Sequence, residues 1–265
     1  MPLSKSTALF RVVYLALVAL MVALFIIFSI DSYLYILFFV AVLLLWVFTY
    51  RLLANRWMIK VLQILTHQCD PEAFIVKVQK LLQDRAARKR ETYALSLQLW
   101  LGQGLIQSGK YDEAQAVLPP MPVYPENAAK RQLAIMHASL FTTILLHRNL
   151  PDNAATAIEA MRSLADPTVM KRKLAPVQRI IAYSECLLTL QRRRYEGAEE
   201  ALLRFFDTAE TPLNRVNIQY HLGELYVHFH QPEKARAAFQ YAADHGNTLY
   251  AATQAREALS RLEQA

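Results

Sequence analysis

This chain of 265 residues contains only six glycines and two cysteines. No stretch of useful length alternates apolar and polar residues, which is the pattern of a half-buried β-strand. Apolar residues instead recur at helical spacing, so the sequence predicts an all-α fold. Cys69 and Cys186 are far apart in a segment that we expect on the cytoplasmic side of a membrane, so a disulfide is not expected.

Charge is nearly absent from residues 12–50, where Asp31 is the only charged side chain. As one α-helix this run would be about twice as long as the ~30 Å hydrocarbon core of a bilayer. Asp31 and Ser32 form an adjacent polar pair that can cap a new helix, so the chain is predicted to cross twice. We expect a transmembrane helical hairpin over residues 1–56, with helices at about 12–30 and 33–50. A single broken or re-entrant segment is the alternative.

The basic residues that flank the uncharged run indicate its orientation. Lys5 and Arg11 precede the run, and Arg51, Arg56 and Lys60 follow it. Because Lys and Arg collect on the cytoplasmic side of membrane proteins, both termini are predicted to be cytoplasmic. With no eukaryotic targeting signal in view, we expect a multi-pass protein of a bacterial inner membrane.

The two predicted membrane helices also lack charged residues, glycine and proline in their interiors. Transporters and channels normally need charges or broken helices inside the membrane, and close helix pairs often need a seam of small residues. The hairpin is therefore predicted to be an anchor, and residues 57–265 are predicted to carry the function on the cytoplasmic side.

Basic residues gather in three short clusters, at residues 88–90, 171–173 and 192–194. Near a membrane such clusters are attracted to anionic lipid headgroups. Each cluster taken alone is explained equally well as ordinary surface charge that is exposed to solvent. Nucleic-acid binding is not expected, because no stripe of aromatic residues accompanies the clusters.

A repeated pattern covers the chain from about Leu97 to its C-terminus. The clearest unit carries Leu222, Gly223, Tyr226, Ala235, Phe239 and Ala242. This spacing resembles the tetratricopeptide repeat, a helix–turn–helix of about 34 residues in which a large residue packs into small ones. The resemblance implies that Gly223 and Ala235 meet where the two helices of this unit cross. It also implies an α-solenoid of helix–turn–helix repeats over residues 57–265.

Three further units are aligned on the same pattern. The first has Leu101, Gly102 and the turn at residues 109–114, and the two weaker ones align on Ala154 and Ala198. The spacing between units exceeds 34 residues, so the array is degenerate. The final helix, expected over residues 248–263, resembles the capping helix that such arrays need.

The sequence shows no catalytic, cofactor or metal motif. Gly102, Gly104 and Gly109 follow a helical run rather than a strand, so they do not predict a nucleotide site. His221, His228 and His230 have no Cys, Asp or Glu that completes a close ligand set, and we interpret them as ordinary histidines. We expect no enzyme activity and no cofactor.

The tetratricopeptide resemblance implies a binding surface on the inner face of the first helix of each unit. A protein or peptide partner would bind there, on a membrane-anchored scaffold. The alternatives are that several of these positions pack against a neighbouring helix, or that the cluster 192–194 is the binding site. A second functional class, a helical-array enzyme or a regulator of envelope or lipid processes, stays open. The candidate residues are Gln103, Gln107, Thr143, His147, Tyr183, Gln191, Tyr220, Glu224 and His228.

Glu224 is the only formal charge among these positions, and no Lys or Arg is expected on the inner face. The carboxylate clamps of the family use Lys and Arg there. We therefore expect a partner segment of mixed polar and apolar character rather than an acidic tail, held by aromatic contact with Tyr183 and Tyr220. The oligomeric state is not indicated by the sequence.

Overall fold

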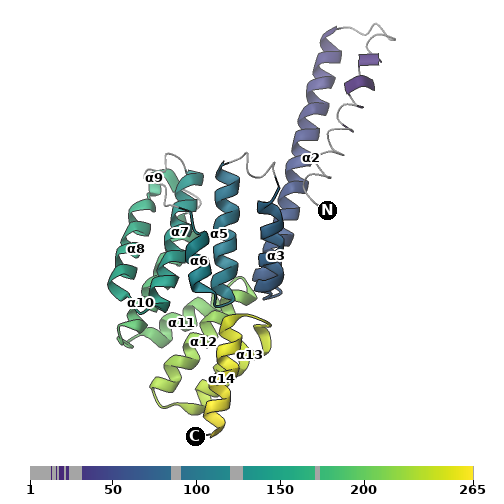
Figure 1. The fold of residues 1–265 in the computed structure, drawn as a ribbon. Coiled ribbons are helices and arrows are strands. Elements are labelled where there is room, and N and C mark those ends of the chain that lie inside the picture. The colour runs from purple at the N-terminus through teal and green to yellow at the C-terminus, as the bar shows by residue number, and fades with distance from the viewer. Residues whose placement is uncertain are drawn as a thin grey trace.

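The computed structural model describes residues 32–84, 91–119, 128–170 and 174–264, together with a few residues between 13 and 23. All the regular elements in these ranges are helices (Figure 1), which confirms the all-α prediction. The basic clusters 88–90 and 171–173 lie outside the described residues, as does most of the first predicted membrane helix.

Helix α2 (Ser32–Thr66) continues without interruption from the second predicted membrane helix into the body of the fold, from which it projects in Figure 1. The helix has no end near residue 56, where the sequence placed the boundary of the hairpin. Among the residues that the structure describes, no helix has an apolar stretch long enough to span a membrane. The two-helix hairpin stays a prediction.

Antiparallel helix pairs form the body of the protein. The pairs are the end of α2 with α3 (Pro71–Leu82), α5 (Glu91–Gln107) with α6 (Tyr111–Val117), α7 (Ala128–His147) with α8 (Pro151–Leu164), α10 (Leu174–Gln191) with α11 (Ala198–Asp207), and α12 (Pro212–His228) with α13 (Pro232–His245). The short α9 (Pro167–Met170) follows α8, and α14 (Tyr250–Gln264) ends the chain. Asp70 caps α3 as predicted, because its carboxylate accepts a hydrogen bond from the amide of Ala73 at 2.9 Å.

The four hairpins that begin with α5, α7, α10 and α12 share one turn geometry. Each has a residue with positive φ just after its first helix: Gly109, Asn149, Arg193 and His230. In every case the amide of the next residue donates to the carbonyl five residues earlier, at 2.8–3.0 Å, as in a Schellman cap. The alanine five residues after the positive-φ residue is buried in all four: Ala114, Ala154, Ala198 and Ala235. The alanines on which the sequence aligned its repeats therefore occupy equivalent places.

The side chain nearest to Gly223 belongs to Phe239 on α13. A Cβ atom placed on Gly223 would lie 2.5 Å from Cε1 of Phe239, so the ring of Phe239 covers this glycine. The ring fits here because Gly223 has no side chain to occupy the same space. The expected meeting of Gly223 with Ala235 stays a prediction.

Replacing Ala235 with Leu should lower the free energy of unfolding by about 1–3 kcal/mol, because a longer side chain overpacks a close helix contact. Ala235 has no exposed surface, whereas Ala237, two residues along the same helix, is exposed. The matched control Ala237→Leu should leave stability nearly unchanged. Thermal unfolding followed by circular dichroism measures both variants, and equal melting temperatures for the two would contradict the packing described here.

The array closes back on itself, so that its last helices pack beside its first ones. Residues of α2, α3 and α5 share one buried core with residues of α11 to α14, while α7, α8 and α10 surround a second core. The side-chain amide of Asn247 donates to the carbonyl of Gln68 at 3.0 Å, across 179 residues of sequence. Helix α14 packs on α13 and α12 and buries Ala251 and Ala255, as expected of a capping helix.

Candidate functional site

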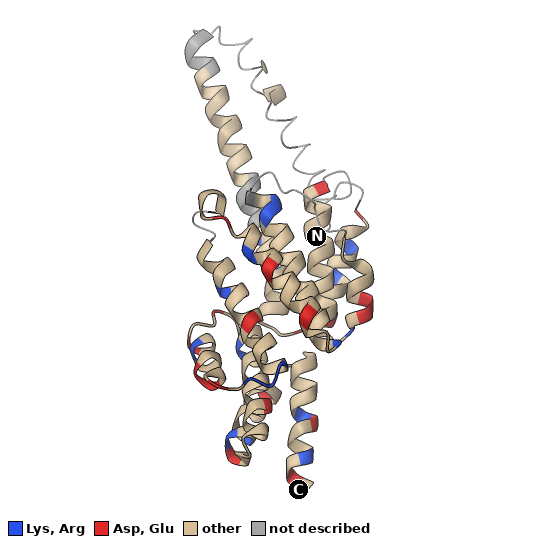
Figure 2. Ribbon diagram, turned by 90° about the vertical axis from the view of Figure 1, so that its left-hand side faces the viewer, with Lys and Arg blue, Asp and Glu red and all other residues tan. Residues whose placement is uncertain are grey.

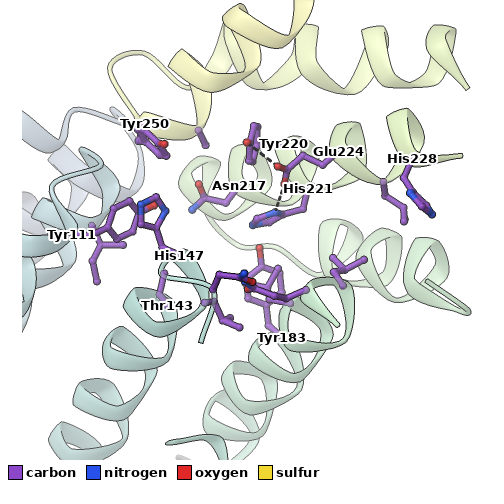
Figure 3. A pocket seen from close by; sticks show the side chains of 18 of the residues that line it. Tyr111, Thr143, His147, Tyr183, Asn217, Tyr220, His221, Glu224, His228 and Tyr250 are labelled. Atoms are coloured by element: carbon purple, nitrogen blue, oxygen red, sulfur yellow. Dashed lines mark hydrogen bonds and ion pairs between the residues drawn. The ribbon is translucent and has the colours of Figure 1, made fainter. Parts of the chain in front are cut away.

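A cavity of about 610 Å³ lies where the ends of α5, α7, α10 and α12 meet the start of α14 (Figure 3). It is open on one side, and its lining mixes aromatic, amide and aliphatic side chains. A volume of this size matches pockets for small molecules, roughly 300–1,000 Å³, rather than a groove for a long peptide. The predicted inner face is therefore a cavity rather than a long groove, because the array closes back on itself.

Eight of the nine residues predicted for the inner face line this one cavity. They are Gln107, Thr143, His147, Tyr183, Gln191, Tyr220, Glu224 and His228. The ninth, Gln103, does not line it, since α5 reaches the cavity only with its last turn, at Ile106 and Gln107. The structure thus brings together residues from four hairpins, and their role in binding a partner stays a prediction.

Aromatic residues outside the predicted set complete the lining. The ring of Tyr111 stacks on His147, with centroids 3.6 Å apart, and meets the edge of Tyr250 at 5.9 Å. Tyr195 lies against His228, with centroids 3.8 Å apart. Tyr111 and Tyr195 each follow a positive-φ turn residue by two positions, so the turn pattern in the sequence could have found them. Tyr250 comes from α14 and has no such signal.

Arg193 also lines the cavity, so the prediction that no Lys or Arg lies on this face was wrong. The error arises because Arg193 is the positive-φ residue of its turn, which the inner-helix positions do not include. The basic cluster 192–194 does not form one outer face. Arg192 pairs with Asp152 at 2.9 Å, while its neighbour borders the cavity.

Amide side chains join neighbouring parts of the lining. Nδ2 of Asn217 donates to Oε1 of Gln107 at 3.2 Å and so links α12 to α5. Nε2 of Gln191 donates to Oδ1 of Asn149 at 2.9 Å and links α10 to the turn after α7. The first bond joins hairpins that are distant in sequence, and the second joins two consecutive hairpins.

Among the described residues that line the cavity, Glu224 is the only acidic one. Tyr220 donates its hydroxyl to Oε1 of Glu224 at 2.9 Å, and Nδ1 of His221 lies 3.1 Å from Oε2 (Figure 3). Burial opposes ionisation of this carboxyl, but the bonds from His221 and Tyr220 outweigh it, so its pKa is below the ordinary value for Glu. The carboxylate is therefore ionised at neutral pH, and 52% of the Glu224 side chain is exposed.

Tyr183 rises from α10 with its hydroxyl directed into the cavity (Figure 3). The hydroxyl oxygen is buried and has no hydrogen-bond partner among the described residues. Burial, and to a smaller extent the charges of Cys186 and Glu224, raises the pKa of this phenol well above its usual value. The hydroxyl therefore stays protonated and is available as a donor.

Within the part of the chain that the structure describes, no cluster of three His, Cys, Asp or Glu side chains could hold a metal ion. His230 lies in the turn after α12, away from the cavity lining. Comparison of the chain with protein-family models, with curated proteins and with solved structures gave no match.

Proposed function

We propose that this protein is a membrane-anchored helical-repeat scaffold whose inner cavity binds a short segment of a partner protein. The observation that carries the proposal is the convergence of residues from four hairpins on one cavity lined by aromatic and amide side chains. Such side chains bury large areas and hydrogen-bond a peptide backbone, as at protein–protein hot spots. The cavity volume favours a few residues of a partner rather than a long helix.

The repeat units support a tetratricopeptide-like solenoid as the family of this scaffold. Four hairpins repeat the same turn and the same buried alanine. Tetratricopeptide units are recognised by this kind of helix–turn–helix with small residues at the crossing. The shared core between the first and last hairpins would make this member more closed than an open superhelix.

The membrane anchor has its own support in α2. Large apolar side chains on this helix are 60–72% exposed, namely Leu37, Phe38, Leu44, Leu45 and Phe48. Figure 2 shows charged residues over the body of the fold and none along the described part of α2 that projects from it. A contiguous apolar surface of this kind marks a membrane or protein contact. We propose that it lies in the lipid bilayer, with both termini on the cytoplasmic side.

A photo-crosslinking experiment tests the proposed binding site. The crosslinking amino acid p-benzoylphenylalanine is placed at Leu187, which lines the cavity, or at Gln103, which does not. In membranes that hold the full chain, Leu187 should give one discrete crosslinked partner, and Gln103 should not. Adding Tyr220→Ala to the Leu187 probe should remove the crosslink, because the aromatic contact is lost.

Circular dichroism of the same variants provides the control for folding. A partner that crosslinks equally from both positions would contradict the cavity as the binding site. So would a crosslink that survives Tyr220→Ala but disappears when residues 192–194 are neutralised, since that result would place the partner at the turn after α10.

A further inference from the structure

The cavity contains an ionised carboxylate, Glu224, that forms no salt bridge with a Lys or Arg of the described chain. Glu224 pairs with His221, which lies on the same helix, α12. Its two oxygens accept one bond each, from Tyr220 and His221, and a carboxylate has about four acceptor sites. The side chain of Glu224 is about half exposed, with 52% of its surface accessible, so the unused acceptor sites can be reached by a positive group supplied by the ligand.

The surroundings of this carboxylate suit an organic cation. Tyr220 donates its hydroxyl to Glu224 at 2.9 Å, and Tyr111 and Tyr183 line the same cavity. Tyrosine rings attract ammonium and guanidinium groups through their faces, and their apolar surface suits the alkyl stem of a long side chain.

The unpartnered hydroxyl of Tyr183 supplies a second recognition group. It is buried in the cavity wall and can donate one hydrogen bond. Leaving such a donor unpaired is unfavourable, so a ligand with a carbonyl oxygen at this place would satisfy it. A peptide presents a cationic side chain and a backbone carbonyl within the same residue.

We propose that the cavity binds a Lys or Arg side chain of the partner segment, with its cation on Glu224 and a carbonyl oxygen of the same residue accepting from Tyr183. This inference rests on the proposed function and names the chemistry of the partner. Arg193 at the cavity edge is the competing feature, because it would favour an anionic ligand instead.

Capped amino acids test the inference on the full chain in detergent micelles. The probes are the N-acetyl, N-methylamide forms of lysine, arginine, norleucine and glutamate, together with n-butylamine as a free amine. Binding is measured by saturation-transfer NMR titration. The lysine or arginine probe should bind at least about tenfold more tightly than norleucine, which has the same stem without the charge, because the pair with Glu224 is partly desolvated.

Two substitutions and one control assign the selectivity to residues. Glu224→Gln should remove the preference for lysine over norleucine. Glu233→Gln, an exposed carboxylate at the start of α13, should keep it. Tyr183→Phe should weaken the capped lysine several-fold and leave n-butylamine unchanged, because only the capped probe has a carbonyl.

The outcomes separate this inference from the proposed function. If norleucine or glutamate binds as tightly as lysine to the unsubstituted protein, the cation site is wrong, even where the Leu187 crosslink to a partner stands. If n-butylamine binds as tightly as capped lysine and no partner crosslinks, the cavity takes a free amine and the proposed scaffold function fails. Because the first comparison uses the unsubstituted chain, it holds even if a variant fails to fold.

Discussion

Replacing Phe239 with Ala should lower the free energy of unfolding by about 3–5 kcal/mol, the largest effect we expect from a single substitution in the repeat body. Phe239 is 2% exposed and belongs to the core that joins the first and last hairpins. Its ring covers Gly223 and lies 6.0 Å from the ring of Tyr220. The space left by the ring cannot refill easily, because α12 packs against α11, α13 and α14 as well.

Chemical denaturation followed by circular dichroism measures this loss. Phe229, which is 38% exposed just after α12, provides the matched control, and Phe229→Ala should cost less than about 1 kcal/mol. Gly223→Ala should be harmful alone, because its Cβ would meet the Phe239 ring, and nearly harmless beside Phe239→Ala. Additive losses in the double variant would show that the two residues do not share one contact.

The helical pairs were predictable because their signals are local. The buried alanines Ala114 and Ala235 lie a fixed five residues after a turn, and the cap at Asp70 needs only its next three residues. Such features depend on short-range geometry, so a single sequence carries them. The start of α14 differs from the prediction by two residues, at Tyr250, whereas α2 continues to Thr66, well past the predicted end near residue 50.

The closure of the array was not predictable, because it depends on contacts between distant residues without periodicity. Asn217 bonds Gln107 across 110 residues, and a Cβ atom on Gly109 would lie 2.5 Å from Tyr250. The repeat pattern assigns Gln107 and Gly109 to places within one unit but does not indicate which distant unit they contact, so it gives no sign of the return to the first.

The residues of the candidate site that occupy repeat positions were predictable, and the others were not. Residues such as Tyr183 and Glu224 occupy inner positions of their helices, and the repeat pattern finds them. Arg193 and Tyr250 reach the cavity from a turn and from the capping helix, which the pattern does not cover. Gln103 does not line the cavity, because α5 reaches the cavity only at its end. Whether an inner-face residue reaches the cavity depends on how its helix is placed along its own axis, and the sequence does not specify that placement.

The second large effect concerns the apolar part of α2. Replacing both Leu44 and Phe48 with Arg should release the protein from membranes, if this part of the helix lies in lipid as we propose. The two side chains are 62% and 60% exposed, and their spacing of four residues places them on one face. An arginine near the centre of a membrane helix costs about 2.5–3.5 kcal/mol on insertion scales, so two of them oppose insertion strongly.

The matched control places the same two charges lower on the same helix. Ile59 and Gln63 are also exposed and four residues apart, but they lie where α2 joins the body of the fold. Ile59→Arg with Gln63→Arg should therefore leave membrane association intact. Flotation of membranes on a sucrose gradient measures the result, since inserted protein floats with lipid whereas released or aggregated protein stays at the bottom. If the Leu44 and Phe48 variant floats like the unsubstituted chain, the exposed apolar face of α2 does not lie in the bilayer, and a protein surface must cover it instead.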